Sequence, residues 1–174
     1  MIGPWWGACQ GPVLAQGDLI PDCVLPIFAD AISTESGEIV DLDTVKANLI
    51  VATQTCDLQN NKAQFVACCV TYTIDEFEAA FPQYRTKGRW ETVRKGREES
   101  LHLIASPITP NDNRTALVVD FGHLVSLPLA YVSRHSGCIG QRWRLNSPYL
   151  EHYSQALARF FMRVGLPSTL PPFA

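Results

Sequence analysis

The chain has 174 residues, of which 47% are hydrophobic and 18% are charged, and its formal net charge is −3. This length and balance favour one folded domain over residues 1–174 and exclude a disordered chain. The longest apolar runs fall far short of the roughly 20 residues that span a bilayer. Residues 1–16 contain no Lys or Arg and no continuous apolar core, which argues against a secretory signal. We therefore expect a cytoplasmic protein with no membrane partner.

Charge is distributed unevenly along the chain. Residues 1–45 contain seven acids and no Lys or Arg, whereas six of the 14 bases lie between Arg85 and Arg97. A segment of this kind attracts polyanions. The six cysteines are irregularly spaced without a CxxC pair, and the four histidines lack ligand-type spacing. We expect reduced thiols, no metal site and no other cofactor.

The first half of the chain predicts strands. Residues 19–28 form an apolar run that two prolines interrupt, typical of an irregular or edge strand. An acidic, turn-prone connection over 29–45 follows. Residues 48–55 and 64–72 are β-branched apolar runs separated by a polar turn over 57–62, which predicts two central antiparallel strands.

Two short helices are predicted next, within a basic insertion over about 74–100. Thr73 precedes Glu76 by three residues, the spacing of a capping box, so a helix should begin there and end before Pro82. A second, exposed helix is expected over 89–99. The later strands are expected at residues 101–105, 116–121, 124–132 and 141–145.

The C-terminal segment predicts an amphipathic helix over about 148–164. Ser147 suits the N-cap and Pro148 the first helical position, and Gly165 follows the end. Its apolar residues recur at helical spacing: Tyr149, Tyr153, Leu157, Phe160, Phe161 and Val164. With six or seven strands and few helices, the fold class is mainly β (α+β).

The order of these elements resembles that of the PemK/MazF-like family of toxin endoribonucleases. The resemblance rests on the phrase Gln16-Gly-Asp-Leu19 and on residues 48–55, 65–71 and 117–129. It implies an SH3-like β-barrel with short inserted helices and a closing C-terminal helix. It also implies single-stranded RNA as substrate, a toxin–antitoxin or phage-defence role, an antitoxin or other protein partner, and a homodimer.

The family cleaves RNA without metal, using an Arg just before the second strand and a Ser or Thr at the end of the following strand. Thr71 matches the second position, and at the first this chain has Lys46, a point donor that lacks the bidentate grip of Arg on phosphate. The resemblance implies attack by the 2′-hydroxyl that leaves a 2′,3′-cyclic phosphate. Gln54 and Cys56, which follow a buried strand, complete the candidate catalytic residues; alternatively, their neighbours cap a turn and Cys56 is a small buried hydrophobe.

The basic segment is the candidate RNA-binding surface, because cations neutralise phosphates and an aromatic ring stacks on an unpaired base. Its members are Arg85, Lys87, Arg89, Trp90, Arg94, Lys95 and Arg97. The alternatives are a solvated helix and a surface for an acidic partner protein.

Two other functions remain open. One is a non-catalytic protein-interaction module with a degenerate toxin fold, and the other is a Cys56-dependent hydrolase. Asp120 lies inside an apolar strand and is expected to pair with Arg142 or Arg144. The motif Arg134-His135-Ser136 is expected to form a loop, which either binds or cleaves RNA or is merely polar.

Overall fold

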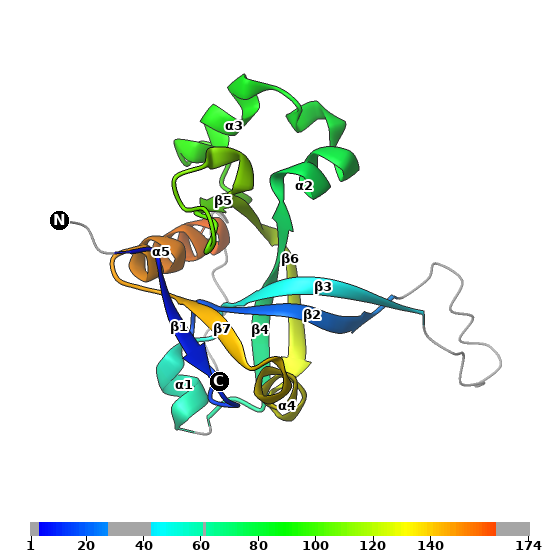
Figure 1. Cartoon of the computed structure of the whole chain (residues 1–174), viewed down its shortest axis with the longest axis vertical. Helices are drawn as coiled ribbons and strands as arrows, with labels where there is room; N and C mark the ends of the chain where they lie inside the picture. Colours follow the sequence, from blue (N-terminus) through cyan, green and yellow to red (C-terminus); the bar gives the residue numbers. More distant parts are fainter. Residues whose placement is uncertain (1–3, 28–42, 61, 163–174) are drawn as a thin grey trace, which may run out of the picture.

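The computed structural model describes residues 4–27, 43–60 and 62–162. Within these ranges the chain forms seven strands, five α-helices and two short 3-10 helices (Figure 1). The strands are β1 (Trp6–Gln10), β2 (Asp18–Pro26), β3 (Thr44–Val51), β4 (Phe65–Thr73), β5 (Leu101–Ile104), β6 (Leu117–Pro128) and β7 (Gln141–Leu145). The helices are α1 (Thr55–Gln59), α2 (Ile74–Ala80), η1 (Pro82–Tyr84), α3 (Lys87–Arg94), η2 (Asn113–Thr115), α4 (Leu129–Ile139) and α5 (Tyr149–Phe161).

The described strands form one antiparallel sheet in the order β1-β7-β2-β3-β4-β6-β5. The sheet is open, with β1 and β5 at its edges. This confirms the mainly β (α+β) prediction. Strand β1 was not predicted, because Trp6–Gln10 has no run of apolar residues in alternation. None of the described helices is both long and apolar enough to cross a membrane.

The two central strands are buried on both faces, as their continuous apolar runs predict. Leu49, Ile50 and Val51 on β3 are fully buried, and β4 pairs with β3 in the expected antiparallel register. On one face the core includes Val132 of α4; on the other it includes Tyr153 of α5. Helices α4 and α5 therefore cover opposite faces of the sheet (Figure 1).

Three sequence predictions were wrong in this region. The segment after β3 contains helix α1 rather than only a turn. The strand expected over residues 124–132 ends at Pro128, and its last residues open helix α4, which also contains Arg134, His135 and Ser136. The helix is fixed on β2, because His135 Nε2 lies 2.7 Å from the Pro21 carbonyl oxygen. Arg134-His135-Ser136 is therefore part of a packed helix and not a loop.

Asp18 anchors the start of β2, so the Gln16-Gly-Asp-Leu19 motif has a structural role. Its side chain is fully buried and accepts hydrogen bonds from Arg142, Arg144 and the Ala15 backbone N–H. Gly17 adopts a φ of 80°, a conformation that favours glycine.

The pairing expected between Asp120 and these arginines is wrong. Asp120 instead accepts a hydrogen bond from the Gly122 N–H at 2.9 Å. Of the two alternatives for residues 19–28, the irregular strand is confirmed and the edge strand is wrong. Strand β2 pairs with β3 and β7, and a register shift between Ile20 and Cys23 accommodates Pro21.

The basic insertion forms a helical lobe over one face of β5 and β6. The capping box of Thr73 and Glu76 is confirmed, and α2 ends before Pro82. The second helix is shorter than expected and ends at Arg94. A small core of Ile74, Phe77, Val93, Leu101 and Val118 holds the lobe against the sheet.

Helix α5 confirms the amphipathic helix predicted at the C-terminal end, but its first helical residue is Tyr149 rather than Pro148. Pro148 occupies the N-cap position rather than the first turn, so Ser147 does not cap the helix. Tyr153 is fully buried, whereas Phe161, expected on the apolar stripe, is 55% exposed. Val164, Gly165 and most of the acidic connection over 29–45 lie outside the described residues.

Candidate functional site

Strands β3 and β4 separate at a fork next to Thr71. Their pairing runs from Val51 opposite Cys68 to Asn48 opposite Thr71 and ends there. Beyond this point β3 pairs only with β2, and β4 pairs only with β6. The fork opens because β3 continues beside β2 whereas β4 continues beside β6.

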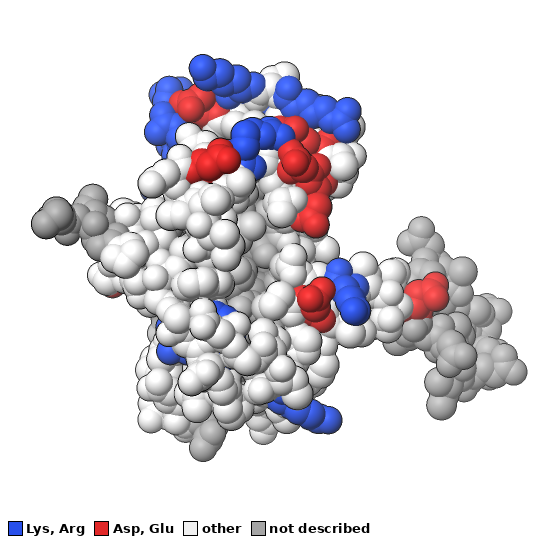
Figure 2. Space-filling model, in the orientation of Figure 1, with Lys and Arg blue, Asp and Glu red and all other residues white. Residues whose placement is uncertain are grey.

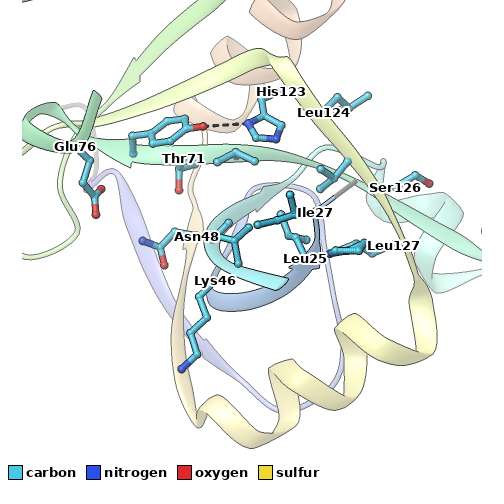
Figure 3. Close-up of a pocket in the computed structure, with 16 residues that line it drawn as sticks. Leu25, Ile27, Lys46, Asn48, Thr71, Glu76, His123, Leu124, Ser126 and Leu127 are labelled. Atoms are coloured by element: carbon cyan, nitrogen blue, oxygen red, sulfur yellow. Dashed lines mark hydrogen bonds between the residues drawn. The ribbon is translucent and has the colours of Figure 1, made fainter. Parts of the chain in front are cut away.

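An open groove of about 810 Å³ lies at this fork, and we call it the Thr71 groove (Figure 3). Its lining is mainly apolar and includes Leu25, Ile27, Val45, Val70, Leu124 and Leu127. The polar residues of the lining include Lys46, Asn48, Thr71, Tyr72, Glu76 and His123. Figure 3 shows Glu76, Thr71, Asn48 and Lys46 on one side of the view, with the leucines and Ile27 on the other.

The groove brings together two of the four candidate catalytic residues. Lys46 lies two residues before Asn48 on β3, so it is on the same strand face as Asn48 and Thr71. Lys46 is exposed, and it makes no ion pair within the described ranges. Thr71 is 3% exposed, and its Oγ1 has no hydrogen-bond partner among the described residues.

A tyrosine–histidine pair forms a second polar feature of the groove. The Tyr72 hydroxyl lies 3.0 Å from His123 Nδ1 (Figure 3). Burial raises the pKa of Tyr72, and the nearby Asp120 and Glu76 carboxylates raise it further. The protonated Tyr72 hydroxyl donates to Nδ1 or accepts from it, according to the tautomer of His123, and Nε2 is the other ring nitrogen. In the tautomer that carries its proton on Nδ1, Nε2 is unprotonated and is a suitable general base.

Gln54 and Cys56 do not join this site. They lie beyond the opposite end of β3, at the start of α1. The exposed Cys56 thiol is 3.6 Å from Gln54 Oε1 and 3.8 Å from Asp57 Oδ1. Neither neighbour is an imidazole or a cation, the groups that activate a thiol in cysteine hydrolases.

The basic segment lines a second hollow, which we call the basic cleft. It has a volume of about 910 Å³ and lies beside the edge strand β5, between the helical lobe and α5. Five predicted RNA-binding residues line it: Arg85, Lys87, Trp90, Arg94 and Lys95. Arg89 and Arg97 are not part of the lining.

Two further arginines enter the cleft from distant parts of the chain. Arg114 belongs to η2 and Arg159 to α5. Six Lys and Arg residues line the cleft against three acids, Glu78, Glu91 and Asp112, an excess of three positive charges. The tertiary fold therefore concentrates positive charge that the sequence distributes over three segments.

Some of these cations are already engaged. Arg94 pairs with Glu91, and Arg114 pairs with Asp75 and Glu78. Lys87, Lys95 and Arg159 make no ion pair within the described ranges. Figure 2 shows the blue and red side chains interleaved over the helical lobe, with few charges on the rest of the visible face.

Aromatic rings also line the cleft, but Trp90 is not free to swing toward a base. Its indole N–H donates to Glu78 Oε1 at 2.8 Å, and its ring packs near Phe77 and Tyr84. His102 stacks near Phe121, and its burial lowers its pKa to about 4, with His152 and Arg159 adding to the shift. His102 is therefore neutral at pH 7, whereas His152 is exposed.

Sequence reasoning missed His123 and Asn48 at the groove and Arg114, Arg159 and His152 at the cleft. No spacing signal connects these residues, because tertiary packing brings them together. The one local clue is Gly122, since β6 shifts register between Asp120 and Leu124 and so projects His123 at the fork.

Comparing the chain with protein-family models, curated proteins and solved structures gives no significant match. The similarity to the PemK/MazF-like family, including its barrel, therefore stays a prediction that rests on the motifs. Within the described ranges, no three His, Cys, Asp or Glu side chains are grouped to hold a metal ion.

Proposed function

We propose that this protein binds single-stranded RNA in the basic cleft and is a divergent PemK/MazF-like protein of a toxin–antitoxin or phage-defence system. One observation carries the proposal. Cations from α3, η2 and α5 converge on one cleft beside β5, and three of them, Lys87, Lys95 and Arg159, form no salt bridge within the described ranges. Backbone phosphates supply the complementary charge.

The cleft suits an unpaired strand better than a duplex. A volume of about 910 Å³ accommodates a few nucleotides but encloses no double helix. Single-stranded nucleic acid is held by cations that follow the backbone and by rings on which bases stack. Trp5 and His152 also line the cleft; Trp5 is stacked on Tyr149 with ring centroids 3.7 Å apart, so the exposed His152 ring is the one placed to stack on a base.

Cleavage is the second half of the proposal, and the resemblance supplies it. Lys46 would neutralise the scissile phosphate, Thr71 would donate to it, and His123 would take the proton of the 2′-hydroxyl. The 2′-oxygen would then bond to phosphorus as the bond to the 5′-oxygen breaks, and the leaving 5′-oxygen would take a proton from water, which yields a 2′,3′-cyclic phosphate and a 5′-hydroxyl. Since Thr71 Oγ1 is buried in the free protein, the geometry supports binding better than it supports cleavage.

Binding is tested by fluorescence anisotropy with a short mixed-sequence RNA in EDTA. We expect Lys87→Gln/Lys95→Gln to weaken binding and to reduce the slope of log K against log salt by about 0.7 for each lost phosphate contact. The matched control is Arg89→Gln/Arg97→Gln, which removes the same charge from the same lobe outside the cleft. Equal losses in the two variants would refute a role for the cleft.

Arg159→Gln is the sharper test, because only the fold connects Arg159 with the basic segment. We expect this variant to weaken RNA binding as well. In the same reactions, RNA products are examined for 2′,3′-cyclic ends. Cleavage that persists in both Lys46→Ala and Thr71→Ala would exclude the Thr71 groove as its site.

The second candidate function is a non-catalytic protein-interaction module. Exposed apolar side chains near the fork favour it: Val24, Ile27 and Val45 are 43%, 44% and 45% exposed. Exposed apolar patches often mark protein interfaces. A purified partner whose affinity falls with Val45→Asp, together with no RNA binding, would favour this function over the first.

A further inference from the structure

The Thr71 groove, to which the cleavage proposal assigns Lys46, Thr71 and His123, also has a large apolar wall that neither RNA binding nor cleavage uses. Its apolar wall consists of aliphatic side chains from β2, β3, β4 and β6. Its polar side carries groups from β3 and β4 (Figure 3). Sites for small organic molecules are typically concave and mainly apolar, with a few convergent polar groups, at volumes of about 300–1,000 Å³. The groove matches this description at about 810 Å³.

The groove contains a buried polar group without a partner. Thr71 is 3% exposed, and its hydroxyl makes no hydrogen bond among the described residues. A buried hydroxyl without a partner is costly, so such groups are rare in folded proteins. Thr71 Oγ1 is enclosed in the free protein, so a ligand reaches it only when the fork widens, and a hydrogen bond accepted from Thr71 then removes this cost.

The polar side is rich in hydrogen-bond donors. Asn48 Oδ1 already accepts from the Asp22 N–H at 3.2 Å, which leaves the Asn48 amide nitrogen as its donor. Lys46 adds the only positive charge of a Lys or Arg in the lining. These donors and the Thr71 hydroxyl suit an acceptor, and an anionic one complements the charge of Lys46.

The one acid in the lining does not supply that acceptor. Glu76 Oε2 accepts from the Thr73 N–H at 2.8 Å and from the Thr73 hydroxyl at 2.9 Å, so its carboxylate is engaged in capping α2. The groove therefore places the donors of Lys46, Asn48 and Thr71 beside an apolar wall, and the buried Thr71 hydroxyl is unsatisfied among the described residues.

We propose that the Thr71 groove binds a small organic acid, with its carboxylate at Lys46, Asn48 and Thr71 and its apolar body along Leu25, Ile27, Leu124 and Leu127. Charge complementarity with Lys46 selects the acid. The aliphatic wall selects a ligand with a hydrocarbon body over a small hydrophilic anion.

Octanoate is the probe. The controls are 1-octanol, which has the hydrocarbon body without the carboxylate, and acetate, which has the carboxylate without the long hydrocarbon body. Isothermal titration calorimetry of the full chain should show one saturable octanoate site, with binding at least fivefold weaker for octanol and undetectable for acetate. Amide NMR shifts should be largest at residues 46–48 and 70–72. Equal affinity for octanol and octanoate, or no saturable binding, would overturn the proposal.

Variants then locate the site. Lys46→Gln should weaken octanoate binding at least fivefold, whereas Lys62→Gln, an exposed lysine away from the groove, should leave it unchanged. Thr71→Val keeps the side-chain shape but removes the hydroxyl, so it should also weaken octanoate binding. Leu124→Asp should abolish octanoate binding. Unchanged affinity in Lys46→Gln, or NMR shifts confined to the basic cleft, would contradict the assignment. RNA binding by the cleft is measured separately, so either proposal can fail alone.

Discussion

Replacing Asp18 by Ala tests the buried ion-pair cluster that holds β2 against β7. The Asp18 carboxylate is fully buried, and Arg142 beside it is 2% exposed. Asp18 Oδ2 accepts from Arg142 Nη2 at 3.1 Å and from Arg144 Nη2 at 2.9 Å. Without this carboxylate, the Arg142 guanidinium would retain only the carbonyl oxygens of Gly11 and Val13 as partners.

The expected cost follows from the asymmetry of buried ion pairs. Removing one partner leaves an uncompensated buried charge and costs about 3–5 kcal/mol. A domain of this size has a total stability of about 5–15 kcal/mol, so Asp18→Ala should remove a large part of it. Adding Arg142→Met should recover part of the loss, because the second substitution removes the charge that the first leaves unpaired.

Urea unfolding, followed by circular dichroism and tryptophan fluorescence, measures these differences. The control is Asp43→Ala, an exposed acid whose loss should change the free energy of unfolding by no more than about 0.5 kcal/mol. An Asp18→Ala variant that loses less than about 1 kcal/mol would refute the view that this cluster is a structural anchor.

Three further predictions concern buried or exposed polar groups. Because the pKa of His102 is lowered to about 4, the unfolded chain binds a proton more readily than the native protein as pH falls from 6.5 to 4. Native stability should therefore fall in this window by as much as about 3 kcal/mol, and His102→Gln should flatten the decline in pH-dependent urea titrations. Thr71→Val should leave the protein as stable as before or stabilise it by about 1 kcal/mol, since it removes an unsatisfied hydroxyl; a loss above that size in thermal unfolding would indicate a hidden partner. Iodoacetamide at neutral pH should label Cys56 and Cys138, which are both exposed, at similar rates by mass spectrometry, and selective labelling of Cys56 would instead favour the hydrolase.

Sequence patterns predicted local structure where a short motif carries the signal. The capping box of Thr73 and Glu76, the central strands and the amphipathic α5 all depend on neighbours within a few residues. Helix α4 was missed because the apolar residues that open it continue those of β6, and periodicity cannot separate a buried strand from a buried helix over so short a run. Strand β1 was missed because its pairing with β7 decides its conformation.

Only part of the candidate site could be predicted from the sequence. Thr71 and Lys46 do share a face at the fork, since antiparallel pairing places Asn48 opposite Thr71. Gln54 and Cys56 are separated from them by the length of β3, which the spacing of polar residues does not reveal. Arg159 joins the basic cleft through the packing of α5, a contact between distant segments that no local pattern encodes.

RNA–protein crosslinking tests the central claim most directly. A short single-stranded RNA carrying 4-thiouridine is irradiated with the full-length protein, and the crosslinked peptides are mapped by mass spectrometry. RNA binding in the basic cleft predicts crosslinks on residues 85–95 and on α5 near His152 and Arg159, which high salt suppresses. Crosslinks confined to the Thr71 groove or to the opposite end of β3, or none at saturating RNA, would contradict it.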